Sequence, residues 1–183
     1  MDILLQSLQE FYNHERHVTK FLDIIKGNKI SLRIIDWFVT NYSKKYNIFY
    51  DIYETEHGKH TLVSDNNIFM KQFNIYNAYK SQLKSYNKKK FDPFCRKIRI
   101  SYEFTTNDNI ETTVGQLNFF RWAIDNLVID YIYKHYDLIE EDMNKYSTNI
   151  KKKSNQRKKR QELSKSASRG LLSNKRNIIL DFN

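Results

Sequence analysis

The chain has 183 residues, of which 40% are hydrophobic and 15% aromatic, with 4 Gly, 1 Pro and a formal net charge of +10. This length predicts one domain with an appendage, and the single cysteine excludes an intramolecular disulfide and a cysteine-based zinc site. The N-terminal sequence lacks the apolar core of a signal peptide, and no apolar run is long enough to span a bilayer, so we expect a soluble, intracellular protein.

The positive charge is concentrated at the C-terminal end. Residues 148–183 contain 11 Lys and Arg against 2 Asp and Glu, a balance of +9. Residues 1–147 keep 20 cations and 19 anions, a balance of +1. We therefore predict a nearly neutral globular domain over 1–147 and a basic, flexible tail over 148–183.

The first 42 residues predict two helices. Apolar side chains recur every three or four positions over 4–25, interrupted by Glu15, which indicates an amphipathic helix that ends at Gly27. Ser31 is placed to cap a second helix that continues to about Tyr42.

A β-hairpin and a third helix are expected next. Residues 47–54 (NIFYDIYE) are rich in aromatic side chains and predict a strand, which a turn at 56–59 would join to a partner at 60–64. The helical period returns over 67–88, and Pro93 ends any continuation of that helix.

The second half of the domain predicts a hairpin and a long helix. Apolar and polar residues alternate over 96–104, and a turn at 107–109 would lead to a short returning strand at 110–112. Thr113 and Gln116 have the capping-box spacing and open a helix to about Met143, with a possible bend near Asn126. Its expected core stripe consists of Leu117, Phe120, Ile124, Leu127, Tyr131 and Leu138.

These elements predict an α+β fold, in which helices pack on a small antiparallel sheet and a disordered basic C-terminal tail follows. The tail ends in an apolar segment, Ile178–Phe182, which is typical of a strand. It would either dock back on the domain as an edge strand or add to the sheet of a partner.

The tail is the main candidate for binding nucleic acid, because closely spaced cations neutralise phosphates and release counterions. Two other interpretations remain open: a localisation signal and a solubilising tail without a ligand. The candidate nucleic-acid-binding residues are Lys151, Lys152, Lys153, Arg157, Lys158, Lys159, Arg160, Lys165, Arg169, Lys175 and Arg176.

A second basic segment lies between the third helix and the strand that follows it. Phe91 and Phe94 are interleaved with its cations, so it could hold phosphates while stacking on bases. The alternative is that both rings are part of the core and the lysines lie at a helix end. The cations of this segment are Lys88, Lys89, Lys90, Arg96, Lys97 and Arg99.

Metal and catalytic chemistry have little support in the sequence. His14 and His17 lie three residues apart, and His57 and His60 flank a turn, but no HExxH, CxxC or paired-carboxylate motif accompanies them. Cys95 has no sequence signature that couples it to a base. We expect no metal, no cofactor and no catalytic residue, and therefore no enzyme.

Three blocks of the sequence resemble a small protein family encoded by giant nucleocytoplasmic DNA viruses. They are FNIYNAYKSQLKSYNKKKFDPFCRKIRI, TTVGQLNFFRWAIDNLVIDYI and KSASRGLLSNKRNIILDFN. The resemblance implies a viral setting, in the host cytoplasm, the viral factory or the virion, and transfers no functional residue.

Two functions follow from these observations as hypotheses. The first is a viral accessory protein that binds nucleic acid non-specifically through its tail, in genome packaging or viral transcription. The second is a minor capsid or virion assembly protein that contacts viral structural proteins. Neither hypothesis involves a membrane, and a nuclear location remains possible if the tail is a localisation signal.

Overall fold

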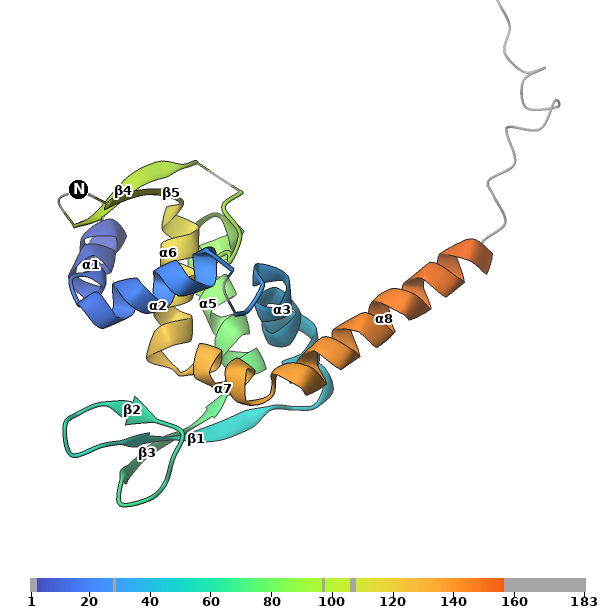
Figure 1. Ribbon diagram of the computed structural model, residues 1–183, viewed down its shortest axis with the longest axis horizontal. Coiled ribbons are helices and arrows are strands. Elements are labelled where there is room, and N and C mark those ends of the chain that lie inside the picture. Colours follow the sequence, from blue (N-terminus) through green and yellow to red (C-terminus); the bar gives the residue numbers. More distant parts are fainter. Residues whose placement is uncertain (1–2, 28, 97, 106–107, 157–183) are drawn as a thin grey trace, which may run out of the picture. The chain divides into compact units, whose positions relative to one another are not determined.

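A computed structural model describes residues 3–27, 29–96, 98–105 and 108–156 (Figure 1). The chain divides into two units after Lys145, and α8 begins in the first unit and continues in the second. The helices are α1 (Ile3–Tyr12), α2 (Glu15–Ile25), α3 (Leu32–Trp37), the π-helix η1 (Phe38–Tyr42), α4 (Ser43–Lys45), α5 (Ile75–Lys90), α6 (Val114–Asp125), α7 (Val128–Lys134) and α8 (Tyr136–Gln156). The strands are β1 (Phe49–Glu54), β2 (His60–Thr61), β3 (Ile68–Asn74), β4 (Ile100–Thr105) and β5 (Asp108–Thr112).

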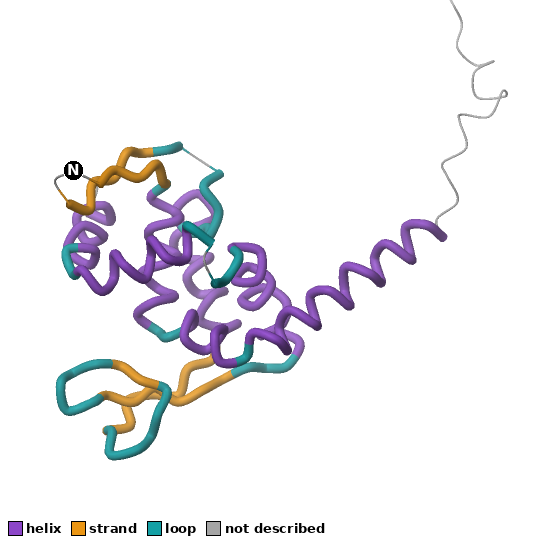
Figure 2. The backbone as a smooth tube through the Cα atoms, in the orientation of Figure 1, coloured by secondary structure: helices purple, strands orange, loops and turns teal. Residues whose placement is uncertain are grey.

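The first unit has the predicted α+β architecture. Its strands form a three-stranded antiparallel sheet in the order β2-β1-β3 and a separate β4–β5 hairpin. Figure 1 shows these two strand groups at opposite ends of the helices of this unit, and Figure 2 shows how much of the backbone is helical.

The core is aromatic around α6. Phe119 and Phe120 are fully buried, and the Phe119 ring lies 5.2 Å from that of Phe91 and 5.8 Å from that of Trp122. Phe91 is therefore a core residue rather than a stacking platform, as one of the two alternatives for this segment predicted. Burial of such large apolar surfaces is the main stabilising contribution to the unit.

Predicted helix ends are confirmed at several positions. The Ser31 hydroxyl accepts a hydrogen bond from the Ile34 amide at 3.3 Å, and that of Thr113 accepts one from the Gln116 amide at 3.1 Å. Gly27 follows α2 with a φ of +68°, in the left-handed region that favours glycine.

The prediction of a helix over 67–88 is wrong for its first third. Residues Ile68–Asn74 form β3, which pairs with β1 on the side opposite to β2. The helix begins only after Asn74, whose side chain accepts a hydrogen bond from the Asn77 amide at 3.0 Å. Pairing with β1 therefore overrides the local period of the apolar residues.

The first predicted helix is divided into α1 and α2. His17 provides a physical reason, because its Nδ1 donates to the carbonyl oxygen of Phe11 in the last turn of α1, at 2.8 Å. This bond satisfies a helix-end carbonyl while the chain turns at Asn13 and His14.

The last predicted helix is divided into α6, α7 and α8. The break near Asn126 was expected, and Leu127 there has a φ of +57°. A second break at His135 was not expected, and it changes the face that α8 turns to the core. Leu138, predicted to be buried, is 58% exposed, whereas Ile139 is fully buried.

Helix α8 extends the helical backbone into the predicted tail, as far as Gln156. Residues 157–183, including the apolar segment Ile178–Phe182, lie outside the described part of the chain. Within the described part, no helix combines the length and the apolar character needed to cross a membrane.

Candidate functional site

The candidate nucleic-acid-binding residues of the tail fall on both sides of the last described residue. Lys151, Lys152 and Lys153 belong to the backbone of α8. The other eight, from Arg157 to Arg176, lie outside the described residues. The backbone of these first three lysines of the tail is thus helical.

The second basic segment begins at a kink in α5. Asn87 has a φ of +53° and a ψ of 176°, so Lys88–Lys90 form a separate turn rather than the end of a continuous helix. The Asn87 side chain accepts a hydrogen bond from the Lys89 amide at 2.8 Å and caps this turn. The three lysines lie in the last turn of α5, as the second alternative for this segment predicted.

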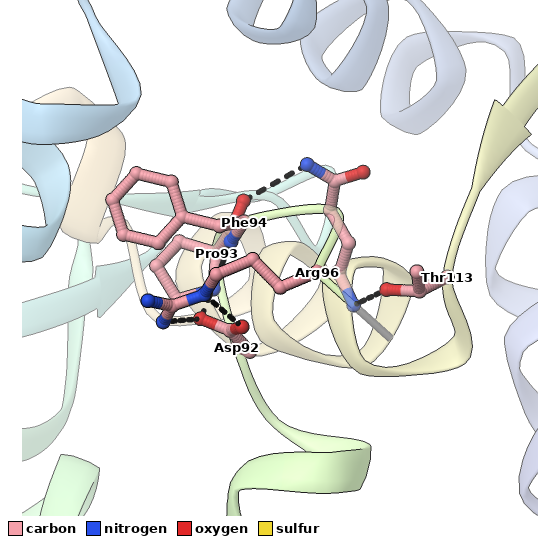
Figure 3. Close-up of polar contacts among 6 residues, drawn as sticks. Asp92, Pro93, Phe94, Arg96 and Thr113 are labelled. Carbon is pink, nitrogen blue, oxygen red and sulfur yellow. Dashed lines mark hydrogen bonds and ion pairs between the residues drawn. The ribbon is translucent and has the colours of Figure 1, made fainter. Parts of the chain in front are cut away.

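Arg96 is paired with a buried carboxylate. Its Nε and Nη2 donate to the two carboxylate oxygens of Asp92, at 2.9 and 2.8 Å, and Asp92 is only 6% exposed (Figure 3). The guanidinium also lies 4.7 Å from the ring centroid of Phe94. The hydrogen bonds to Asp92 raise the pKa of Arg96, and they occupy donors that a phosphate would need.

Hydrogen bonds from side chains of α6 hold the same loop against the start of that helix. Gln116 donates through Nε2 to the carbonyl oxygen of Pro93 at 2.9 Å and accepts through Oε1 from the Thr112 hydroxyl at 2.8 Å. Asn118 donates to the carbonyl oxygen of Lys90 at 2.9 Å. The Gln116 side chain therefore ties three segments together instead of completing a capping box with Thr113.

The remaining cations of this segment differ in their surroundings. Arg99 forms an ion pair with Glu111 at 2.7 Å, with both side chains about 60% exposed, and Lys97 lies outside the described residues. Lys88, Lys89 and Lys90 are exposed. The segment is a joint between α5, α6 and β4, and the pairing of Arg96 and Arg99 reduces its net positive charge.

Sequence reasoning missed both of these pairs, although the sequence contains the signals. Asp92 and Arg96 are four residues apart. Glu111 lies opposite Ser101 in the β4–β5 ladder, near the position of Arg99. Opposite charges that lie close in sequence or across a hairpin are candidates for an ion pair, although residues 92–96 are not helical.

Sequence reasoning also missed a buried carboxylate next to α4. Asp142 is 8% exposed and accepts hydrogen bonds from Trp37 Nε1 at 3.2 Å, from the Tyr46 hydroxyl at 2.9 Å and from Lys45. The local sequence does not distinguish Asp142 from its neighbours Glu140 and Glu141. Only the tertiary contacts single it out.

Three of the four histidines considered for a metal site do come together. His14, His17 and His60 line one cavity, whereas His57 is exposed on the neighbouring turn and does not line it. The ring centroids of His14 and His17 are 5.4 Å apart. Among the described residues, no three His, Cys, Asp or Glu side chains are arranged to hold a metal ion.

Comparisons with known proteins agree with the resemblance noted in the sequence. The profile of a family described as a family of unknown function, DUF7197, matches residues 1–179. The chain is 41% identical over 170 residues to "Uncharacterized protein L507" of Acanthamoeba polyphaga mimivirus. The aligned region covers 89% of this chain and 61% of that protein. The chain thus spans less than two thirds of the length of this relative. No solved structure matches the chain.

Proposed function

We propose, because the chain belongs to the family of unknown function DUF7197, that it is a non-enzymatic giant-virus accessory protein that binds nucleic acid through its basic C-terminal segment. It would act in genome packaging or viral transcription, in the host cytoplasm, the viral factory or the virion. Its ligand would be the phosphate backbone of DNA or RNA, recognised without regard to base sequence.

The uneven distribution of charge carries this proposal. Residues 148–183 hold 11 of the 31 cations and only 2 of the 21 anions of the chain. Such a density of Lys and Arg attracts a polyanion over long distances and gains affinity by releasing its counterions.

The structure supports the tail over the second basic segment as the main binding element. Arg96 and Arg99 each face a carboxylate, from Asp92 and Glu111, so any phosphate would compete with an existing partner. Lys88, Lys89 and Lys90 are exposed and could extend the surface. The described residues of the segment thus hold three exposed lysines, against 11 cations in residues 148–183.

Two charge-matched variants of the full chain test this proposal. One replaces Arg157, Lys158, Lys159 and Arg160 by Gln, and the other replaces Lys26, Lys29, Lys80 and Lys84, all exposed on the first unit, by Gln. Each variant lowers the formal net charge from +10 to +6. Affinity for a generic duplex and a generic single strand is measured by gel shift at several salt concentrations.

We expect the tail variant to lose at least about tenfold in affinity and the matched variant to lose much less. An equal loss in both variants would mean that binding depends on overall charge and not on the tail. Retention of binding by a chain that ends at Ser147 would move the site to Lys88–Arg99.

A second candidate function, assembly of the virus particle, is favoured by an exposed apolar strand. On β3, Ile68 is 71% exposed, Phe69 57% and Met70 43%, and β3 is an edge strand of its sheet. Exposed apolar side chains next to a free strand edge are typical of protein–protein contacts. Replacing Ile68 and Met70 by Lys should then reduce incorporation of the protein into particles while leaving its binding to nucleic acid unchanged.

A further inference from the structure

We infer that a cavity between the start of α2, the turn before β2 and the end of α6 binds a phosphate-class oxyanion. The cavity has a volume of about 350 Å³. This size is within the range of small-ligand sites. The polar side chains that line it are His14, Arg16, His17, Lys59, His60 and Asp125.

Two of the imidazoles are held in a defined orientation. His17 Nδ1 lies 2.8 Å from the carbonyl oxygen of Phe11, and His60 Nδ1 lies 3.2 Å from that of Asp125. A carbonyl oxygen only accepts hydrogen bonds, so Nδ1 carries the proton in both rings. When the ring is protonated, Nε2 becomes a second donor, available to an anion.

Fixed positive charge surrounds these rings. Arg16 and Lys59 reach the cavity from two different elements and are both exposed, whereas Asp125 contributes the one carboxylate of the lining. The cavity also lies at the N-terminus of α2, where the N-cap residue His14 makes no side-chain capping hydrogen bond. Amide groups of a first helical turn and nearby cations together favour an anion.

The arrangement of the imidazoles suits an oxyanion better than a metal ion, since no three His, Cys, Asp or Glu side chains of the described residues are arranged to hold a metal. Three rings that bind one metal ion converge on a point about 2 Å from each nitrogen. Here the rings belong to the wall of a cavity that could hold several water molecules, and His17 stacks on Phe11 at 3.9 Å between centroids. Donors that approach from several sides match the tetrahedral oxygens of phosphate or sulfate.

Protonation of His17 should therefore influence binding. Burial lowers the pKa of His17, and the charges of Arg16 and His14 add to this effect. The Phe11 carbonyl and the Asp125 carboxylate act in the opposite direction.

His60 from β2 also faces the cavity, and the Glu54 carboxylate of β1 lies beside the Gly58 turn. Since a bound anion favours the charged form of His17, affinity should rise as the pH falls.

The test uses the full chain and sulfate, an anion whose charge stays constant from pH 6 to pH 8. Sulfate replaces chloride at constant ionic strength while the ring C–H signals of the histidines are followed by NMR. We expect saturable shifts at His17 and His60, with an affinity about tenfold higher at pH 6 than at pH 8. Arg16→Ala and Lys59→Ala should each weaken binding about tenfold. His57→Ala, on the same turn but outside the cavity, should leave binding unchanged.

Several results would overturn the inference. One is a shift without saturation, and another is an equal response of His57, which would indicate a general salt effect. A third is saturation by Zn²⁺ in the absence of any response to sulfate, which would make the cavity a metal site.

Competition then separates two sources of the phosphate. Displacement of sulfate by a mononucleotide points to a small molecule. Stronger displacement by a 5′-phosphorylated oligonucleotide than by its unphosphorylated counterpart points to a nucleic-acid end. The inference does not rest on binding by the tail, because the histidine signals report on the cavity alone.

Discussion

At the scale of single residues, Asp142 is a buried carboxylate of α8 that contacts α3, α4 and the residue after α4. Its carboxylate is buried and accepts hydrogen bonds from Trp37, Tyr46 and Lys45. We expect Asp142→Asn to lower the free energy of unfolding by about 1–3 kcal/mol at pH 7, because charge-assisted bonds are lost in a buried place. Chemical denaturation with urea measures this change. Glu141→Gln is the matched control, since its pair with Lys145 is exposed and should contribute about 0.5 kcal/mol or less.

Asp142 should also make the free energy of unfolding depend on pH. Burial by itself would raise the pKa of Asp142, but the hydrogen bonds from Lys45 and Tyr46 hold that pKa below its ordinary value. The folded state therefore binds this proton less readily than the unfolded state, and the stabilisation is present above the unfolded pKa. It is lost as the pH falls through the lower, folded pKa. The difference in unfolding free energy between the wild type and Asp142→Asn should shrink from about pH 5 downwards, and a constant difference would contradict this account.

Gly115 is a residue whose importance lies in its missing side chain. A Cβ at this position would lie 3.0 Å from the carbonyl oxygen of Lys89 and 3.4 Å from the amide nitrogen of Phe91. Both are backbone atoms. The Asp92 amide donates to the Gly115 carbonyl at 3.1 Å, so the backbone of residues 89–92 has little freedom to move away. We expect Gly115→Ala to destabilise the protein by about 1–2 kcal/mol despite the better helix propensity of Ala. In urea unfolding, Ser81→Ala on the exposed side of α5 should cause no loss.

At the scale of elements, Asn74 separates a strand from a helix that the sequence did not distinguish. Its side chain accepts from the Asn77 amide and also donates to the Asn47 side chain at 3.2 Å. Asn74→Ala should cost about 1 kcal/mol of unfolding free energy, the usual contribution of an N-cap. Asn77→Ala, within the first turn of α5, keeps the cap acceptor and is expected to be neutral. Equal losses in thermal or urea unfolding would show that Asn74 does not cap α5.

The elements that sequence analysis predicted correctly are those whose signals are local. The caps at Ser31 and Thr113, the stop at Gly27 and the β4–β5 hairpin depend on residues within a few positions of one another. The strand β3 was missed because its assignment depends on pairing with β1, about 20 residues away. The exposed Leu138 was missed because the break at His135 resets the helical phase.

The candidate sites also divide into those with a local sequence signal and those that depend on long-range contacts. The concentration of cations in the tail can be read from the sequence alone. A pairing of Arg96 with Asp92 was also suggested by their closeness in sequence. By contrast, nothing local indicates that His60 lies in one cavity with His14 and His17, since more than 40 residues separate them. Only the fold brings these rings together.

At the scale of the whole molecule, the separation of charge predicts how binding to nucleic acid depends on salt. If most of the 11 cations in residues 148–183 contact phosphates, the logarithm of the association constant should fall with the logarithm of salt concentration. The expected slope approaches about −10 for duplex DNA and is shallower for single strands, because each contacted phosphate contributes about −0.9 or −0.7.

Replacing Arg157, Lys158, Lys159 and Arg160 by Gln should make the duplex slope shallower by about 3–4, because each lost phosphate contact removes about 0.9. Replacing the four lysines of the first unit at 26, 29, 80 and 84 should leave the slope nearly unchanged, although the net charge is the same. Titrations at four or more salt concentrations measure both slopes. A change in affinity without a change in slope would mean that these cations act only through the long-range field, whereas a change in slope identifies them as direct phosphate contacts.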